Sequence, residues 1–168
     1  MRKKIKNKVK IEVEIVNRPD TDILNKIINI EKESFGIGAI HEWVLAPFIL
    51  SSKVIVLKVN NEISGVSIFI KEFEEDCVFY FTLALLKKHR GKGLGKYFFE
   101  SSVNIIFEKF PKINKIRYTV DPENNFNNEF FKNYGAKQTD FFKSIYGEGV
   151  DRNYVVLTRN DFYENITF

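Results

Sequence analysis

One stretch decides the fold, and it reads LALLKKHRGKGLG over residues 83–95. Before it, residues 77–86 form an apolar run, which predicts a central strand buried on both faces. After it, apolar residues recur at helical spacing from Phe99 to Phe110, and Pro111 ends the predicted helix. A helix N-terminus presents free backbone N–H groups and a positive dipole end, and glycines let a loop approach a ligand closely. The strand, glycine loop and helix together predict a phosphate-binding cradle.

Two well-known phosphate loops fit this stretch poorly. A P-loop requires a glycine where this chain has Arg90 and a Ser or Thr after Gly95-Lys96, where it has Tyr97. A dinucleotide-binding fingerprint requires Gly-x-Gly-x-x-Gly near the chain start, whereas the spacing here is Gly-x-Gly-x-Gly and several elements precede it.

The rest of the chain reads as alternating strands and helices of one domain. Asn60-Asn61 predicts a tight hairpin, because both residues tolerate positive φ. An acidic turn at 19–22 predicts a helix start, and Pro47 is expected to limit a second short helix. The remaining elements are expected as follows: strands at 9–15, 53–59, 63–70, 113–120, 141–146 and 154–158, and helices at 19–35, 41–50 and 125–134.

The charge is concentrated in two clusters. Of 26 Lys+Arg, six lie in residues 1–10 and five in residues 87–96, and neither segment contains an acid. The other 148 residues carry 15 basic and 22 acidic side chains, a balance of −7, so the body of the chain is not a basic nucleic-acid binder. Hydrophobic residues make up 44% of the chain, which excludes general disorder, and the single Cys77 excludes an internal disulfide.

The segment from Leu83 to Gly95 resembles the acetyl-CoA-binding motif of the GNAT-type N-acetyltransferases. In that family an apolar strand is followed by Arg/Gln-x-x-Gly-x-Gly/Ala, which opens a helix. A second family segment places an Asn eleven residues before a Gly that follows a helix, and Asn124 and Gly135 keep this spacing. The predicted element order agrees over residues 8–160, essentially the whole chain.

The resemblance implies the fold class and the domain limits. The fold is expected to be α/β (α+β), a mixed and mostly antiparallel sheet of six or seven strands with helices on both faces. Strands four and five are expected to splay apart and admit acetyl-CoA. We expect residues 1–7 to be a basic tail and residues 8–168 to form one acetyltransferase domain.

The resemblance also implies residues that contact acetyl-CoA, the cosubstrate. Backbone groups of Leu83, Ala84 and Leu85 are expected to meet the pantetheine arm, and Asn124 to contact the cofactor from the fifth strand. The pyrophosphate is expected to bind the backbone N–H groups of Arg90, Gly91, Lys92, Gly93, Leu94 and Gly95, with Lys96. With one Cys and two His, the sequence offers no metal cluster, and no metal is expected.

The expected reaction is direct attack of a neutral amine on the thioester. The N–H of Leu85 is expected to stabilise the oxyanion. Glu72 and Glu75 are candidate bases, with Glu74 and Asp76 beside them, although a solvated turn is the more common role of such a run. The family often has a proton-donating Tyr where this chain has Phe131, which has no proton to give and is expected instead to pack against the pantetheine arm.

The acceptor is not identified by any motif. His41, Glu42 and Trp43 lie where the family recognises its acceptor, and Tyr80 and Tyr146 are further candidates for that site. A small-molecule or peptide amine is expected, with a protein N-terminus as one possibility, and a catalytically silent acyl-CoA-binding or regulatory module is the alternative function. We expect a cytoplasmic protein without a membrane span and with nucleic acid an improbable partner. The oligomeric state, monomer or homodimer, is left open by the sequence.

Overall fold

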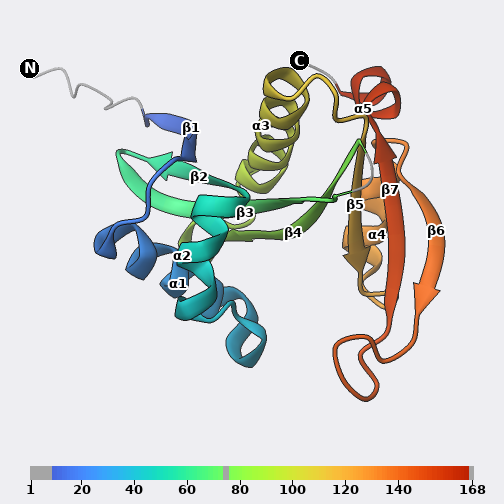
Figure 1. Cartoon of the computed structure of the whole chain (residues 1–168), viewed down its shortest axis with the longest axis horizontal. Coiled ribbons are helices and arrows are strands. Elements are labelled where there is room, and N and C mark those ends of the chain that lie inside the picture. The colour runs from blue at the N-terminus through green and yellow to red at the C-terminus, as the bar shows by residue number, and fades with distance from the viewer. Residues whose placement is uncertain (1–8, 74–75, 167–168) are drawn as a thin grey trace, which may run out of the picture. The chain divides into compact units, whose positions relative to one another are not determined.

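The computed structural model describes residues 9–73 and 76–166. The expected basic tail at residues 1–7 therefore lies outside the described residues. Within these described residues, fourteen elements follow one another in the order that Figure 1 shows. They are β1 Ile11–Val16, α1 Thr21–Phe35, η1 Gly36–Gly38, α2 Glu42–Ser51, β2 Lys53–Val59, β3 Glu62–Lys71, β4 Cys77–Leu85, η2 Lys87–His89, α3 Leu94–Lys109, β5 Lys115–Val120, α4 Asn125–Lys132, β6 Lys137–Phe142, β7 Arg152–Thr158 and α5 Arg159–Asn165.

The seven strands form one mixed sheet in the order β1-β2-β3-β4-β5-β7-β6. The β1–β2, β5–β7 and β6–β7 pairs are antiparallel, whereas β4 and β5 are parallel. The β4–β5 register pairs Cys77 with Lys115, Val78 with Ile116 and Phe79 with Arg117, which involves only the start of β4. Such a short ladder is typical of strands that diverge, and the expected fold class is confirmed.

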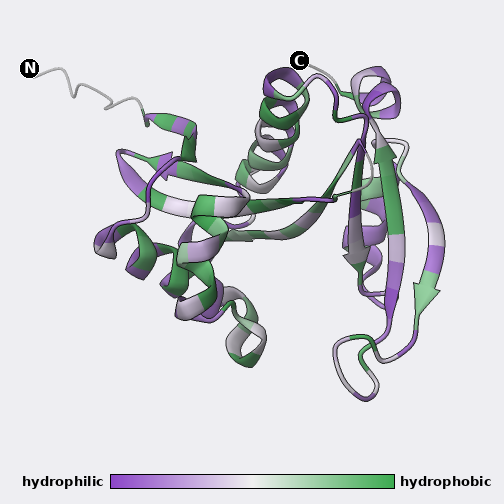
Figure 2. Ribbon diagram, viewed as in Figure 1, coloured by the Kyte–Doolittle hydropathy of each residue, from purple (hydrophilic) through white to green (hydrophobic). Residues whose placement is uncertain are grey.

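Local sequence signals explain several element boundaries. Asp20 caps α1 by accepting a hydrogen bond from the Ile23 N–H at 2.9 Å, and Gly36 ends the helix at a φ of 56°. Asn60 and Asn61 join β2 to β3 at φ values of 51° and 67°, so the predicted hairpin is confirmed. In Figure 2, α3 shows alternating hydrophobic and hydrophilic bands, as its predicted amphipathic pattern requires.

Three predicted details are wrong, and one helix was missed. Helix α2 continues through Pro47 to Ser51, because Leu45 and Ile49 are buried on either side of the proline. The last helix, α5, was not predicted. Strand β6 lies at 137–142 rather than 141–146, since its register with β7 sets its limits. Strand β4 is not buried on both faces, because Phe81 is 42% exposed.

The chain divides into two compact units, and strands β3 and β4 each contribute residues to both. Unit 1 comprises Met1–Ile68 and Thr82–Ser102, and unit 2 comprises Phe69–Phe81 and Val103–Phe168. Of the described helices, none alone has the length and hydropathy of a membrane span; the bent pair 21–38 and 42–51 reaches that threshold only when the two are joined.

Candidate acetyl-CoA site

The glycine loop of unit 1 has the geometry of an anion cradle. Gly91 and Gly93 adopt φ values of 71° and 78°, which L-residues with side chains rarely adopt. A Cβ added to either glycine would meet nothing within 4 Å, so the backbone faces open space. Helix α3 begins at Leu94, and its N-terminal N–H groups and dipole end meet this loop. Both features fit a bound pyrophosphate.

Arg90 fastens the loop to its surroundings within unit 1. Its Nε donates to the Leu85 carbonyl at 2.9 Å, and its terminal nitrogen donates to Ser34 Oγ at 2.8 Å. The Arg90 backbone N–H donates to the Lys87 carbonyl at 3.1 Å. That amide is therefore occupied, which leaves the amides from Gly91 onward for a phosphate.

The lysines of the loop also have partners. Lys88 Nζ lies 3.1 Å from a Glu62 carboxylate oxygen, and Lys92 Nζ donates to the Lys88 carbonyl at 2.7 Å. His89 lies among these cations, and its pKa is lowered by desolvation and by the charges of Lys88 and Lys92. His89 is therefore held toward its neutral form in this loop.

The end of β4 packs closely against a glycine of β3. A Cβ on Gly65 would lie 2.5 Å from Leu85 Cδ2 and 3.2 Å from the Ala84 carbonyl oxygen. Gly65 is thus needed for the approach of β3 to the residues expected to carry the pantetheine contact and the oxyanion donor. Leu85 and Arg90, both predicted site residues, are joined through the hydrogen bond described above.

The predicted acceptor residues of unit 1 lie at the start of α2. His41 caps this helix, and its Nδ1 accepts from the Trp43 N–H at 3.3 Å, which places the ring proton on Nε2. Trp43 is 80% exposed, so its indole is available to a ligand. Glu42 occupies the first turn of α2 and is exposed.

Beside this segment lies a buried carboxylate that the sequence reading missed. Glu31 of α1 is 2% exposed. Its carboxylate accepts from Thr82 Oγ1 at 2.9 Å and from the Ile40 N–H at 3.3 Å. Burial raises the pKa of Glu31, and the two hydrogen bonds oppose that shift. The signal in the sequence was a charged residue at i+4 from Ile27, on the apolar stripe of the helix.

In unit 2, the candidate base Glu72 has other partners. One carboxylate oxygen lies 2.6 Å from the Arg117 guanidinium, and the other lies 3.6 Å from Cys77 Sγ. Glu75 and Glu74 lie outside the described residues. The assignment of a base to this segment stays a prediction, and for Glu72 it would require release from Arg117.

Asn124 and Phe131 lie at the two ends of α4. Asn124 Oδ1 accepts from the Asn127 N–H at 3.0 Å and so caps the helix, which leaves its amide nitrogen as the group expected to meet a cofactor. The ring of Phe131 packs against Tyr118 of β5 with ring centroids 4.4 Å apart.

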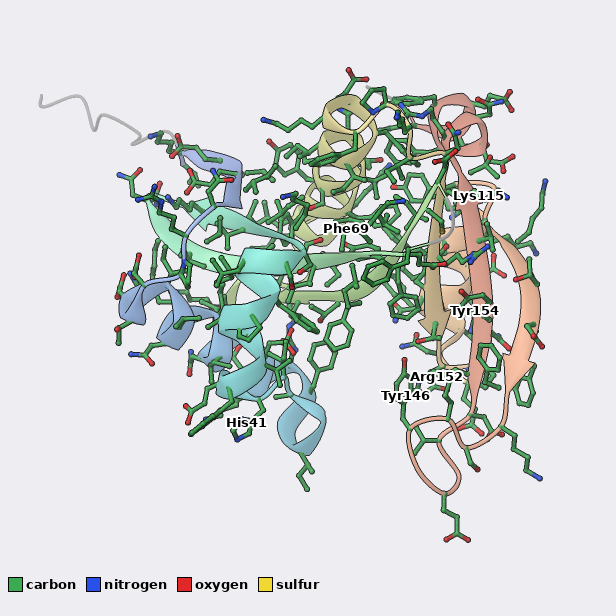
Figure 3. The ribbon with its side chains drawn as sticks, in the orientation of Figure 1. His41, Phe69, Lys115, Tyr146, Arg152 and Tyr154 are labelled. Atoms are coloured by element: carbon green, nitrogen blue, oxygen red, sulfur yellow. The ribbon has the colours of Figure 1, made fainter. Side chains whose placement is uncertain are left out.

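The two remaining acceptor candidates, both in unit 2, differ in their burial. Tyr80 is buried and stacks on Phe69 with ring centroids 4.2 Å apart. Tyr146 is 55% exposed, its hydroxyl lies 3.2 Å from Thr119 Oγ1, and Arg152 lies over its ring. Figure 3 shows Tyr146 and Arg152 together at one end of the β6–β7 hairpin, at the opposite end from Lys115.

Within residues 9–73 and 76–166, no group of three or more His, Cys, Asp or Glu side chains is placed to hold a metal ion. Among the described residues, unit 1 offers backbone amides and an open glycine loop. Those groups suit a phosphate-bearing ligand.

The comparisons with known proteins agree with this geometry. The model of the acetyltransferase (GNAT) family matches residues 24–136, so the chain belongs to the GNAT acetyltransferases. No curated protein sequence matches the chain.

Solved structures show the same fold at low sequence identity. The ribosomal-protein-S18-alanine N-acetyltransferase of Escherichia coli is 15% identical, with a TM-score of 0.76 over 95% of this chain and 100% of that one. A GNAT acetyltransferase of Elizabethkingia anophelis, solved with acetyl-CoA bound, is 15% identical, with a TM-score of 0.67 over 91% and 99%. Naa50 of Arabidopsis thaliana, solved with the bisubstrate analogue CoA-Ac-MVNAL, is 20% identical, with a TM-score of 0.69 over 88% and 98%.

Proposed function

We propose that this protein transfers the acetyl group of acetyl-CoA to a primary amine. The observation that carries the proposal is the open glycine cradle at the N-terminus of α3, with Gly91 and Gly93 at positive φ. Such a cradle binds a pyrophosphate through backbone N–H groups. Membership of the GNAT acetyltransferases supports acetyl-CoA as the ligand.

In the proposed reaction the neutral amine attacks the thioester carbonyl directly. Amides from Gly91 to Lys96 hold the pyrophosphate, and Leu83, Ala84 and Leu85 align the pantetheine arm along β4. The Leu85 N–H donates to the oxygen that becomes negatively charged as the amine adds. Phe131 packs against the pantetheine arm, and the amide nitrogen of Asn124 contacts the cofactor.

We infer that an α-amine at a peptide N-terminus is the first acceptor to test. An α-amino group has a pKa of about 7.7–8.0, against about 10.4 for a lysine side chain, so far more of it is neutral near pH 7.5. This lessens the need for a strong base, which matters because Glu72 is engaged by Arg117. Of the solved structures described above, one is a ribosomal-protein-S18-alanine N-acetyltransferase and another was solved with the bisubstrate analogue CoA-Ac-MVNAL, which supports the same order of testing.

The alternative is a catalytically silent acyl-CoA-binding or regulatory module on the same fold. Phe131, where the family often has a proton donor, is the observation that favours it. A small amine, rather than a peptide, is the second acceptor class, and the exposed Trp43 is the residue expected to contact either acceptor.

Titration calorimetry with acetyl-CoA tests the cofactor, and release of CoA thiol across peptides, polyamines, amino acids and aminoglycosides tests the reaction. Gly93→Glu places bulk and negative charge in the cradle, so we expect it to abolish binding. Gly149→Glu is the matched control, because Gly149 has a φ of 75° and a Cβ there would also meet nothing within 4 Å.

These measurements distinguish the transferase from the silent acyl-CoA-binding module. Binding with thiol release supports the transferase. Binding without release for any amine supports the silent module. Absence of binding at millimolar acetyl-CoA overturns both, and equal loss of binding in the Gly93 and Gly149 variants overturns the placement of the cradle.

A further inference from the structure

The last turn of α1 contacts the segment that leads into the glycine loop, and both lie in unit 1. The Glu33 carboxylate accepts a hydrogen bond from the Lys87 backbone N–H. Ser34 Oγ accepts a hydrogen bond from the Arg90 guanidinium at 2.8 Å. Two adjacent residues of one helix therefore bind the two ends of residues 87–90, which lie 54 and 56 positions further along the chain.

Residues 87–90 connect the end of β4 to the cradle. Within this segment the Arg90 N–H donates to the Lys87 carbonyl at 3.1 Å, which closes a single turn. The Lys87 N–H is satisfied from outside the turn, by the Glu33 carboxylate. Gly91 follows Arg90 directly at a φ of 71°, so contacts that fix residues 87–90 also fix where the cradle begins.

The orientation of the Ser34 hydroxyl is set by α1 itself. It donates to the Ile30 carbonyl, one turn earlier in the helix, at 2.7 Å, so its lone pairs are left to accept from Arg90. Arg90 Nε donates to the Leu85 carbonyl at 2.9 Å. The guanidinium thus bridges the end of β4 and α1, and removal of the Ser34 hydroxyl would detach the α1 end of this bridge.

Another side-chain contact of this segment is less direct. Lys88 Nζ lies 3.1 Å from a carboxylate oxygen of Glu62 in β3, and both side chains are more than half exposed. Exposed pairs of this kind contribute little, because a long flexible side chain must be ordered to form them. The Glu33 carboxylate, in contrast, accepts from a backbone amide, so it constrains the main chain itself.

We propose that Glu33 and Ser34 are positioning residues of the cradle, which hold residues 87–90 so that the amides from Gly91 onward are aligned before the pyrophosphate binds. The inference rests on the proposed acetyl-CoA site, and neither side chain has to touch the ligand. Glycine loses more conformational freedom on ordering than other residues do. A loop that contains Gly91 and Gly93 therefore gains affinity when the segment before it is already fixed.

Glu33→Ala tests this inference through the sign of its effect. The cradle is proposed to bind an anion, so loss of a negative charge beside it would by Coulomb attraction alone tighten CoA binding. Loss of positioning weakens binding instead, and we expect calorimetry to show a rise in the Kd for CoA of about 2- to 12-fold, the effect of one typical hydrogen bond.

Two variants control for the charge of Glu33. Glu33→Gln keeps an acceptor oxygen without the charge, so we expect its Kd for CoA to be no more than about twofold above that of the wild type. Glu62→Ala is the matched control, because it removes an acid that contacts the same segment through the Lys88 side chain rather than through a backbone amide. We expect no rise in Kd for this variant.

Ser34→Ala tests the second contact, and we expect a rise in the Kd for CoA of about 2- to 12-fold. Ser51→Ala is its matched control, since Ser51 Oγ donates to the Pro47 carbonyl at 2.7 Å and so reproduces the bond of Ser34 within its own helix. In an Arg90→Ala background, Ser34→Ala should change the Kd by less than about twofold, because its partner is already removed. The Tm of each single variant in α1 should stay within about 2 °C of the wild type, because both contacts lie toward solvent.

The outcomes distinguish this inference from the proposed function. A wild type that binds CoA but releases no thiol refutes the transferase, and the calorimetric comparison still tests the two positioning residues. A wild type that does not bind CoA overturns the proposed site and this inference with it. Where the wild type binds, an unchanged or lower Kd in Glu33→Ala, or an equal rise in Glu62→Ala, overturns the role of Glu33. An equal rise in Ser51→Ala, or a full effect of Ser34→Ala without the Arg90 guanidinium, overturns the role of Ser34.

Discussion

Gly65→Ala tests how closely β3 must approach the cofactor strand. The added Cβ would lie 2.5 Å from Leu85 Cδ2 and 3.0 Å from Phe98 Cε1. Carbon atoms in contact prefer about 3.5–4.0 Å, so the Leu85 methyl must retreat by about 1 Å or β3 must move. The Ala84 carbonyl oxygen, 3.2 Å away, limits any movement toward it.

Overpacking of this kind costs roughly 1–3 kcal/mol of unfolding free energy. For a chain of this length each kcal/mol lowers Tm by about 2–4 °C, so we expect a fall of roughly 2–12 °C in a thermal scan. Gly38→Ala is the matched control, because its Cβ would approach no atom closer than 3.9 Å and its φ is not positive. We expect its unfolding free energy to change by no more than about 0.5 kcal/mol.

A double-mutant cycle with Leu85→Val sharpens this test. Valine has no Cδ atoms, so it removes the atom closest to the new Cβ. We expect Gly65→Ala to cost about 1 kcal/mol less in the Leu85→Val background, measured by urea unfolding. Additivity of the two substitutions would refute the reasoning, since it would mean that Leu85 is not what excludes a side chain at position 65.

Substitutions at two further positions, Glu31 and Asn124, test side chains that hold elements in place. Burial raises the pKa of Glu31, so above pH about 4.5 the unfolded state loses this proton before the folded state does. The unfolding free energy of the wild type should therefore fall relative to that of Glu31→Gln as the pH rises. Parallel pH profiles of the two proteins in urea titrations would contradict this. Asn124→Ala removes the helix cap that accepts from the Asn127 N–H, and should lower the unfolding free energy by about 1 kcal/mol. Asn124→Ser keeps a capping oxygen and should restore most of this loss. Equal stability of the two variants would exclude the cap.

Local chemistry made part of this fold predictable. The glycine loop, the Asn60-Asn61 hairpin and the acidic start of α1 each depend on residues close in sequence, and each was predicted. The cradle could be predicted for the same reason, because its geometry is set by Gly91 and Gly93 and by the helix that follows.

Tertiary contacts decided what sequence reading missed. Helix α2 passes Pro47 because Leu45 and Ile49 are buried, and Ser51 Oγ adds a hydrogen bond to the Pro47 carbonyl at 2.7 Å. Helix α5 had a local signal, since Thr158 caps it by accepting from the Asp161 N–H at 3.1 Å, but that pattern was not used.

The buried polar side chains that sequence analysis did not single out share one property, which is that their environment is formed by residues distant in sequence. Glu31 receives its hydrogen bonds from Thr82 and Ile40, 51 and 9 residues away. Tyr118 alternates with Ile116 and Val120 on the buried face of β5, where a tyrosine reads as ordinary packing. Only the folded chain shows that its hydroxyl has no partner among the described residues.

The hydrogen bonds of the Arg90 side chain affect how the glycine loop would select among anions. The Arg90 guanidinium donates to the Leu85 carbonyl and to Ser34 Oγ, so it holds the loop in place rather than attracting the anion. Selection of the anion then depends on the loop amides from Gly91 onward, whose directions are fixed by the backbone. A cradle of that kind discriminates by shape, so two linked phosphates should be preferred over a compact ion of equal charge.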